Sequence, residues 1–203
     1  MASSAGTVVD EILGLLRCGA DVRLDEPVSQ LDHALQTAAL AEAAGASAGL
    51  VAAALLHDIG HLLAHRAHDG SCRPGSGGRH HEAVAARYLA PFFGSAVTAP
   101  IALHVRAKRY LCAVEPAYVN RLTPASRWDL AAQGGPLSAH GVDGFEDLPW
   151  ALDALALRRF DDAAKTPGSV TADLEGHRRL LESLVTSHLR GRSRAQVPVP
   201  AAP

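Results

Sequence analysis

Residues 47–65, SAGLVAAALLHDIGHLLAH, decide the fold because they are almost wholly apolar. Ser47 is a typical helix N-cap, and the apolar residues that follow it fall on every side of a helical wheel. We expect such a helix to lie buried at the centre of a bundle and to form its core. Three groups that can bind a metal, His57, Asp58 and His61, interrupt the apolar run.

The doublet of His57 and Asp58 carries the first functional signal. A single histidine in an apolar helix is usually a core residue that is hydrogen-bonded to a backbone carbonyl. An ionised carboxylate is different, because burying it costs several kcal/mol unless it is paired or bound to a metal. Asp58 is expected to face the interior, since this helix has no exposed side. The doublet therefore favours a metal centre over two isolated core residues.

The rest of the sequence is also helical in its periodicity, with turn residues between segments and no alternating strand pattern. We expect an all-α fold in one domain over residues 1–190, with a disordered tail over 191–203. The segment HDGSCRPGSGGR at 68–79 is expected to be a loop, and Trp128 and Trp150 are expected to anchor the core. Expected helices cover 6–17, 29–45, 47–65, 80–92, 98–113, 124–133, 149–165 and 170–189.

Composition limits the partners and the compartment. The 203 residues include 19 basic and 21 acidic side chains, so no excess charge attracts nucleic acid or an anionic membrane. Cys18, Cys72 and Cys112 form no CxxC pair, and no apolar run reaches the roughly 18 residues that span a bilayer. We expect a cytoplasmic protein that binds a small neutral or anionic substrate, with no nucleic-acid or membrane partner.

An isolated histidine, a His-Asp doublet and a distal aspartate in an all-helical chain resemble the HD-domain superfamily. The match extends to six blocks in order between residues 26 and 165, and these are similar to the HD-type mixed-valent di-iron oxygenases. The 2-amino-1-hydroxyethylphosphonate dioxygenases are the nearest group. The resemblance implies a single HD-domain helical bundle with a binuclear metal site. The blocks are HALQTAALAEAAGAS, AALLHDIGHL, HEAVAARYLA, LHVRAKRYLCAVEPAY, LTPASRWDLAAQGGP and LRRFDDAAK.

The resemblance implies two iron ions as the cofactor, in a mixed-valent Fe(II)/Fe(III) state. Histidine and carboxylate ligands without a thiolate suit iron or manganese better than a structural zinc. Asp58 would bridge the two ions, and the second ion would keep open positions for substrate. The implied ligands are His33, His57, Asp58 and Asp161 at the first ion, and Asp58, His81 and His104 at the second.

Two neighbours of these ligands leave alternatives open. His80 adjoins His81 and could take its place as the ligand. Lys165 lies one turn after Asp161, so it either orients that carboxylate or is a surface residue.

Helical spacing places further polar side chains near the ligands. Lys108 follows His104 by four residues and Arg158 precedes Asp161 by three, so each shares a helix face with a ligand. The alternative is that both are solvated surface charges. The resemblance implies catalytic roles for Asp58, His61 and Lys108. The implied substrate-binding residues are Glu26, His61, Lys108, Ser126, Gln133 and Arg158.

One position departs from the family pattern. Glu26 matches the family's glutamate that helps to recognise the substrate amine. The family's tyrosine three residues earlier, which occupies an iron position until substrate arrives, is replaced by Arg23. A guanidinium has no lone pair for a metal, so Arg23 cannot act in this way. The departure leaves open whether the substrate carries an amine.

The resemblance implies an enzyme that uses O2 to cleave the C–P bond of a small 1-hydroxyphosphonate, giving phosphate and a carboxylate. A rival interpretation is an HD-type metal-dependent phosphohydrolase, in which a metal-bound hydroxide attacks a phosphate ester. A di-iron oxygenase acting on another small hydroxylated substrate is also compatible, as is a regulatory binding protein without catalysis. Consumption of O2 separates the oxygenases from the hydrolase.

Overall fold

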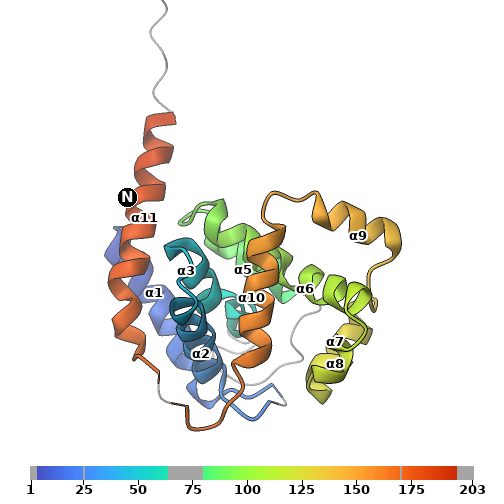
Figure 1. Cartoon of the computed structure of the whole chain (residues 1–203). Coiled ribbons are helices and arrows are strands. Elements are labelled where there is room, and N and C mark those ends of the chain that lie inside the picture. The colour runs from blue at the N-terminus through green and yellow to red at the C-terminus, as the bar shows by residue number, and fades with distance from the viewer. Residues whose placement is uncertain (1–3, 25, 64–79, 170, 196–203) are drawn as a thin grey trace, which may run out of the picture.

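The computed structural model describes residues 4–24, 26–63, 80–169 and 171–195. In these residues every regular element is a helix, which confirms the predicted all-α fold (Figure 1). The expected loop at 68–79 and residues 196–203 of the expected tail lie outside the described residues. None of the described helices is long and apolar enough to cross a membrane.

Most helices lie where the periodicity predicts them, but the short helices α7 and α9 were not expected. Helix α11 continues to Ala195, so the predicted tail is wrong for residues 191–195. The described elements are α1 (Ala5–Cys18), η1 (Gly19–Asp21), α2 (Gln30–Ala43), α3 (Ala48–Leu56), α5 (His81–Leu89), α6 (Ser95–Val114), α7 (Tyr118–Arg121), α8 (Pro124–Ala132), α9 (Ala139–Glu146), α10 (Ala151–Ala163), η2 (Leu174–His177) and α11 (Arg178–Ala195).

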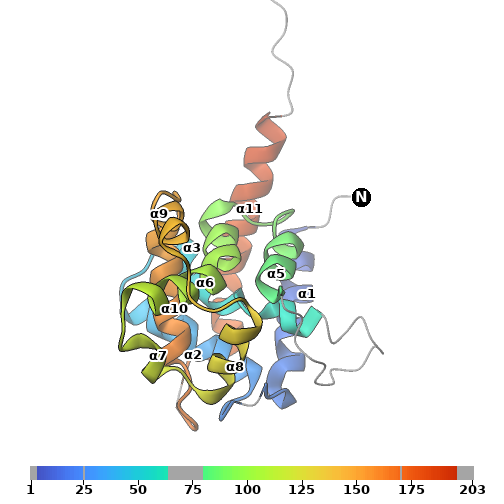
Figure 2. The same cartoon turned by 90° about the vertical axis from the view of Figure 1, so that its right-hand side faces the viewer.

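Helix α3 lies at the centre of the main bundle, as its uniform apolarity predicts. All of its residues from Gly49 to Leu56 are buried, and it packs against α2, α6, α10 and α11. Figure 1 shows α1 and α11 at one side of the molecule and α7, α8 and α9 at the other. The view in Figure 2 faces this second side, with α9 at its upper end and α8 at its lower end.

The predicted continuous helix over 47–65 is wrong at the His-Asp doublet. Helix α3 ends at Leu56, His57 and Asp58 form a turn, and residues 59–63 are helical again. As a result the Asp58 side chain is 18% exposed, which differs from the fully buried position that a continuous helix implied. The Asp58 carboxylate lies between the histidines of the site described below.

Trp128 does not anchor the core, contrary to the sequence-based expectation. It is 79% exposed, because the short helix α8 buries only Ser126 and Leu130 and presents Trp128 on another face. Trp150 is half-buried, at the N-cap of α10. The large side chains of the core are aliphatic residues together with Phe93 and Phe145.

Candidate metal centre

The six predicted metal ligands converge at one place in the bundle. All of them except Asp58 are buried. Each comes from a helix that packs on α3 or from the turn that follows α3, apart from the ligand on α5, which packs on α6. The ligands are His33 on α2, His57 and Asp58 in the turn after α3, His81 at the start of α5, His104 on α6 and Asp161 on α10.

Asp58 lies between two pairs of histidines. Its Oδ2 atom is 3.5 Å from His57 Nε2 and 3.8 Å from His33 Nε2. Its Oδ1 atom is 3.4 Å from His81 Nε2 and 3.8 Å from His104 Nε2. Because each carboxylate oxygen faces a different pair of imidazoles, the arrangement fits a carboxylate that bridges two metal ions.

Asp161 completes the side of the centre formed by the first pair. Its Oδ1 atom lies 3.2 Å from His33 Nε2 and its Oδ2 atom lies 3.9 Å from His57 Nε2. Two carboxylates and two imidazoles therefore converge on this side, a donor set that suits a divalent first-row metal.

Backbone carbonyls orient three of the imidazoles. In the neutral form that binds metals, Nδ1 carries the proton donated to the carbonyl, so the Nε2 lone pairs of His33 and His57 face each other across 3.3 Å. A cation between the rings satisfies both, and hydrogen bonds of this kind are typical of metal-binding histidines. The Nδ1 donors and their acceptors are His33 to Ala164 (2.8 Å), His57 to Ala54 (2.9 Å) and His104 to Ile101 (2.7 Å).

Burial keeps the second pair of histidines neutral, which is the form that binds metals. It lowers the pKa of His104 to about 4, helped by the nearby His57. It also lowers the pKa of His81 well below the usual value, helped by His61. Burial has the same effect on His33, but the hydrogen bond and the charge of Asp161 outweigh it and leave the pKa of His33 raised. The first side of the centre therefore attracts positive charge.

The structure places His81, and not His80, at the centre. The His80 side chain is 80% exposed, and its nearest carboxylate is Glu82 at 3.7 Å. His81 is buried and its Nε2 atom lies 3.0 Å from that of His104. The preference for His81 within the sequence block HEAVAARYLA agrees with this geometry.

His61 is a further possible ligand at the second ion. Asp58, His61 and His81 offer ligand atoms within 4.8 Å of one another, as do His33, His57 and Asp58. The His61 ring stacks on that of His81 with centroids 4.0 Å apart, and its Nδ1 atom is buried without a hydrogen bond. His61 thus lies where it can bind either the second ion or a substrate beside it.

A pocket opens directly onto the metal ligands, and five of the six predicted substrate-binding residues line it. Gln133 is the exception. It lies in an adjoining cavity, which shares Val105 with the pocket, and its Oε1 atom is buried without a hydrogen-bond partner. The predicted residues that line the pocket are Glu26, His61, Lys108, Ser126 and Arg158.

Lys108 carries a positive charge into this pocket. Its side chain is only 3% exposed, and within the described residues it has no hydrogen bond or ion pair. Burial, with a smaller effect from Arg158, lowers the pKa of Lys108 to about 8. The alternative of a solvated surface lysine is therefore wrong. A buried ammonium without a carboxylate partner is costly on its own and is stabilised when an anion binds beside it.

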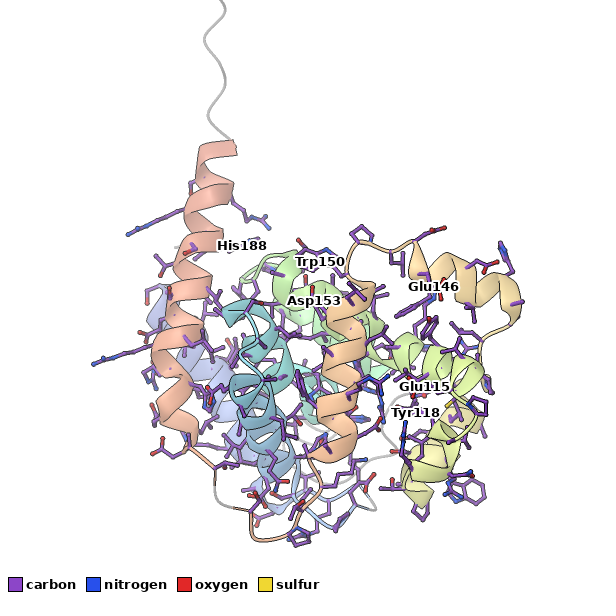
Figure 3. All side chains as sticks on the ribbon, viewed as in Figure 1. Glu115, Tyr118, Glu146, Trp150, Asp153 and His188 are labelled. Carbon is purple, nitrogen blue, oxygen red and sulfur yellow. The ribbon has the colours of Figure 1, made fainter. Side chains whose placement is uncertain are left out.

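Arg158 is also buried, but its guanidinium already has protein partners. Its Nε atom donates to Tyr118 Oη (3.1 Å), and Nη1 donates to Asp161 Oδ2 (2.7 Å). Nη2 donates to Asp162. Tyr118, which Figure 3 labels between α7 and α10, closes this network through its own bond to Asp162. Arg158 therefore holds Asp161, a predicted metal ligand, in place while it lines the pocket.

Tyr118 and Asp162 are parts of the site that the sequence did not reveal. Asp162 adjoins a ligand, and its spacing of four residues from Arg158 was a usable signal. Tyr118 is 40 residues from Arg158 in sequence, and no local pattern connects the two.

Lys165 has neither of the two roles expected from the sequence. Its side chain is 12% exposed, so it is not a surface residue. Its Nζ atom donates to Glu26 Oε1 (2.6 Å) and to Ser126 Oγ (3.1 Å), and not to Asp161.

Arg23 is not among the residues that line the pocket. It is exposed, and its Nη1 atom donates to the carbonyl oxygen of Pro27 (2.7 Å). Tyr88, Tyr110 and Tyr118 are absent from the described pocket lining. That no tyrosine takes the place of the family's iron-binding tyrosine therefore stays a prediction.

Comparison with known proteins shows the family of the chain. The HD domain family matches residues 31–123. The chain is 42% identical over 183 residues, 90% of each chain, to the hydroxymethylphosphonate dioxygenase of Gimesia maris. It is 37% identical over 185 residues to the 1-hydroxy-2-(trimethylamino)ethylphosphonate dioxygenase (glycine-betaine-forming) of Leisingera caerulea, covering 91% of this chain and 93% of the relative. The chain therefore belongs to the HD-domain family, within the group that contains these hydroxyphosphonate dioxygenases.

Proposed function

We propose that the chain uses two iron ions, in a mixed-valent Fe(II)/Fe(III) state, and O2 to cleave the C–P bond of a small 1-hydroxyphosphonate. The observation that carries this proposal is the buried, unpaired Lys108 in the same pocket as the ligands centred on Asp58. The names of both relatives supply the chemical class, because hydroxymethylphosphonate and 1-hydroxy-2-(trimethylamino)ethylphosphonate share a hydroxyl on the carbon that bears phosphorus.

The proposed reaction needs no reductant. A 1-hydroxyphosphonate and one O2 contain all the atoms of one carboxylic acid and one phosphate. For hydroxymethylphosphonate the C–P bond and a C–H bond break, and the products are formate and phosphate. The carbon and phosphorus centres together supply the four electrons that reduce O2.

The chain's own groups bind and orient the substrate. Bound iron supplies O2 activation and electron transfer. Lys108 offers its ammonium to the phosphonate oxygens and offsets one of their two negative charges, as a buried ammonium does for phosphate-like groups. His61, whose Nε2 atom lies 3.9 Å from Asp58 Oδ1, lies close enough to hydrogen-bond a substrate oxygen beside the second ion. Arg158 keeps Asp161 ionised and oriented, because its charge holds the pKa of Asp161 well below the usual value against the effect of burial.

The valence of the irons can be tested by spectroscopy. A coupled Fe(II)/Fe(III) pair has an odd number of unpaired electrons and gives an EPR signal, whereas a diferrous pair does not give the same signal. We expect this signal after partial oxidation of the iron-loaded protein, and we expect hydroxymethylphosphonate to change it. A signal that no hydroxyphosphonate alters would contradict direct binding of the substrate at the centre.

Product analysis tests the reaction. Protein reconstituted with Fe(II) under anaerobic conditions is incubated with hydroxymethylphosphonate, with and without O2, and phosphate and formate are measured. Both products should form only with O2. Methylphosphonate is the matched control, because it lacks the hydroxyl and should give neither product. Phosphate release from a phosphate ester without O2 would identify the phosphohydrolase instead.

A further inference from the structure

An ion pair between Glu26 and Lys165 forms part of the pocket wall. Lys165 Nζ lies 2.6 Å from Glu26 Oε1, and each side chain is only 12% exposed. Thr123 Oγ1 donates to the same carboxylate oxygen at 2.8 Å, and Lys165 also donates to Ser126 at 3.1 Å. The pair is therefore held by hydrogen bonds on both of its members and is not a loose surface contact.

The ion pair determines which charges of the pocket wall are left for a substrate to compensate. Glu26 is the carboxylate in this part of the wall, and Lys165 already compensates its negative charge. Asp58 and Asp161 belong to the metal centre, and Arg158 is paired with Asp161. Asp129 also lines the pocket, but it is exposed and solvated. The described wall thus offers no buried, uncompensated carboxylate outside the metal centre, whereas Lys108 is a buried, uncompensated cation.

One hydrogen-bond acceptor of the pair remains open. Glu26 Oε2 is buried and has no hydrogen-bond partner among the described residues. A buried acceptor of this kind is stabilised by a donor from a ligand or a water. Because Lys165 already balances the charge, a neutral donor such as a hydroxyl satisfies Oε2 without adding charge. An ammonium would leave a net positive charge beside Lys165.

We propose that Lys165 determines substrate specificity, because it occupies against Glu26 the place that a substrate cation would take. The site then accepts hydroxyphosphonates that carry no cationic group. Their reacting carbon bears either two hydrogens, as in hydroxymethylphosphonate, or one hydrogen and a short neutral substituent that donates a hydrogen bond to Glu26. This inference rests on the proposed function, and it adds the chemical class of the substituent.

The test measures binding without turnover. Protein loaded with Fe(II) is titrated calorimetrically, under anaerobic conditions, with hydroxymethylphosphonate and with 1-hydroxy-2-(trimethylamino)ethylphosphonate. The wild-type protein should bind hydroxymethylphosphonate more tightly by roughly tenfold or more, since the trimethylammonium group of the other compound would make a like-charge contact with Lys165. A loss of folded material lowers the apparent stoichiometry for both compounds and leaves the ratio of their dissociation constants unchanged.

Variants of the pair separate charge from shape. Lys165→Met should shift the ratio of the two dissociation constants towards the cationic compound by about tenfold, because it exposes the Glu26 carboxylate. Lys165→Arg keeps the charge and should keep the wild-type ratio. The double variant Glu26→Gln with Lys165→Met buries no uncompensated charge at the pair, so it should fold. It should also lose the shift towards the trimethylammonium compound that Lys165→Met shows. Thr123→Val is the control without a change of charge: it removes a hydrogen bond from the same carboxylate oxygen together with the N-cap of α8, and it should not change the ratio.

The outcomes distinguish this inference from the proposed function. If neither compound binds to the wild-type protein, the proposed function is wrong and the inference falls with it. If both bind but the ratio is the same in the wild-type and Lys165→Met proteins, the proposed function stands and the inference is overturned. Tighter binding of the cationic compound by the wild-type protein would overturn it as well.

Discussion

At the level of single residues, Lys108 is a buried charged side chain that we expect to bind the substrate. It is 3% exposed and has no partner in the described part of the chain. We expect Lys108→Met to raise the free energy of unfolding, on the order of 1 kcal/mol, because a buried uncompensated charge is removed. The same change should weaken substrate binding by about 1.5–3 kcal/mol, or roughly 10- to 150-fold.

Urea unfolding and anaerobic calorimetry measure these two effects of Lys108→Met. Arg190→Met, at an exposed position of α11, is the control and should change neither. Iron content should stay at the wild-type level. Loss of iron from the Lys108→Met protein would show instead that the lysine supports the metal centre.

The titration of Lys108 gives a second prediction. Burial lowers its pKa from 10.5 to about 8, so its positive charge is lost as the pH rises through that value. Affinity for a phosphonate should therefore fall above about pH 8, and Lys108→Met should lack this dependence. The unfolded chain still binds the proton in this range, so the contribution of Lys108 to stability rises with pH between about 8 and 10.5. A wild-type dissociation constant that stays unchanged from about pH 7 to about pH 9 would refute this titration.

Local sequence patterns located individual residues of the candidate site better than their hydrogen-bond partners. His57 and Asp58 are adjacent, and His104 and Lys108 share a helix face, so local patterns predict them. Lys165 and Glu26 are 139 residues apart. Such a pair forms only when the segment before α2 packs near the end of α10. This tertiary contact cannot be predicted from the periodicity of the sequence.

At the level of elements, Gly60 allows the helical residues 59–63 to lie against the first turn of α5. A Cβ atom at this position would lie 2.0 Å from the carbonyl oxygen of His81 and 3.1 Å from the backbone nitrogen of Ala85. Because these are backbone atoms, Gly60→Ala should displace α5 and lower the free energy of unfolding by about 1–3 kcal/mol. It should also reduce iron loading, since α5 begins with the ligand His81.

Gly14→Ala is the matched control for Gly60→Ala. Gly14 lies in α1 and a Cβ atom there meets nothing within 4 Å, so alanine should stabilise the helix by roughly 0.5–1 kcal/mol. Thermal unfolding and metal analysis of both variants test the packing. A Gly60→Ala protein with wild-type iron content would contradict the close approach of α5.

The helices of the bundle were predictable where their apolar faces are long, as in α1, α2 and α6. The break at Asp58 was not, because the apolar residues continue through it and only the geometry of the centre requires the turn. Helices α7 and α9 are too short to show a full periodicity, and α9 also contains Gly141 and Gly144, which weaken the helical signal. Trp128 was misplaced for a related reason, since the buried face of so short a helix as α8 depends on tertiary contacts.

For the whole molecule, the metal centre joins α2, α5, α6 and α10 to the turn after α3. Metal binding should therefore stabilise the folded chain, by about 2.7 kcal/mol when the free metal exceeds its dissociation constant a hundredfold. We expect about two irons per chain after anaerobic reconstitution, and a chelator should lower the unfolding temperature.

Asp58→Ala tests the bridge within this assembly. It should lose both irons and their stabilisation, because both sides of the centre share the Asp58 carboxylate. Asp161→Ala is the comparison, since Asp161 faces only His33 and His57, and it should retain more metal. An Asp58→Ala protein that still binds one zinc tightly would argue against the binuclear centre.

The ratio of O2 consumed to phosphate released tests the proposed reaction most directly. The iron-loaded protein, saturated anaerobically with hydroxymethylphosphonate, is mixed with a limiting, known amount of O2, and phosphate and residual O2 are measured. The proposed oxygenase should release one phosphate for each O2 consumed and none before O2 is added, because the C–P cleavage balances with one O2 and no external reductant. Phosphate released without O2, or O2 consumed without phosphate, would contradict it.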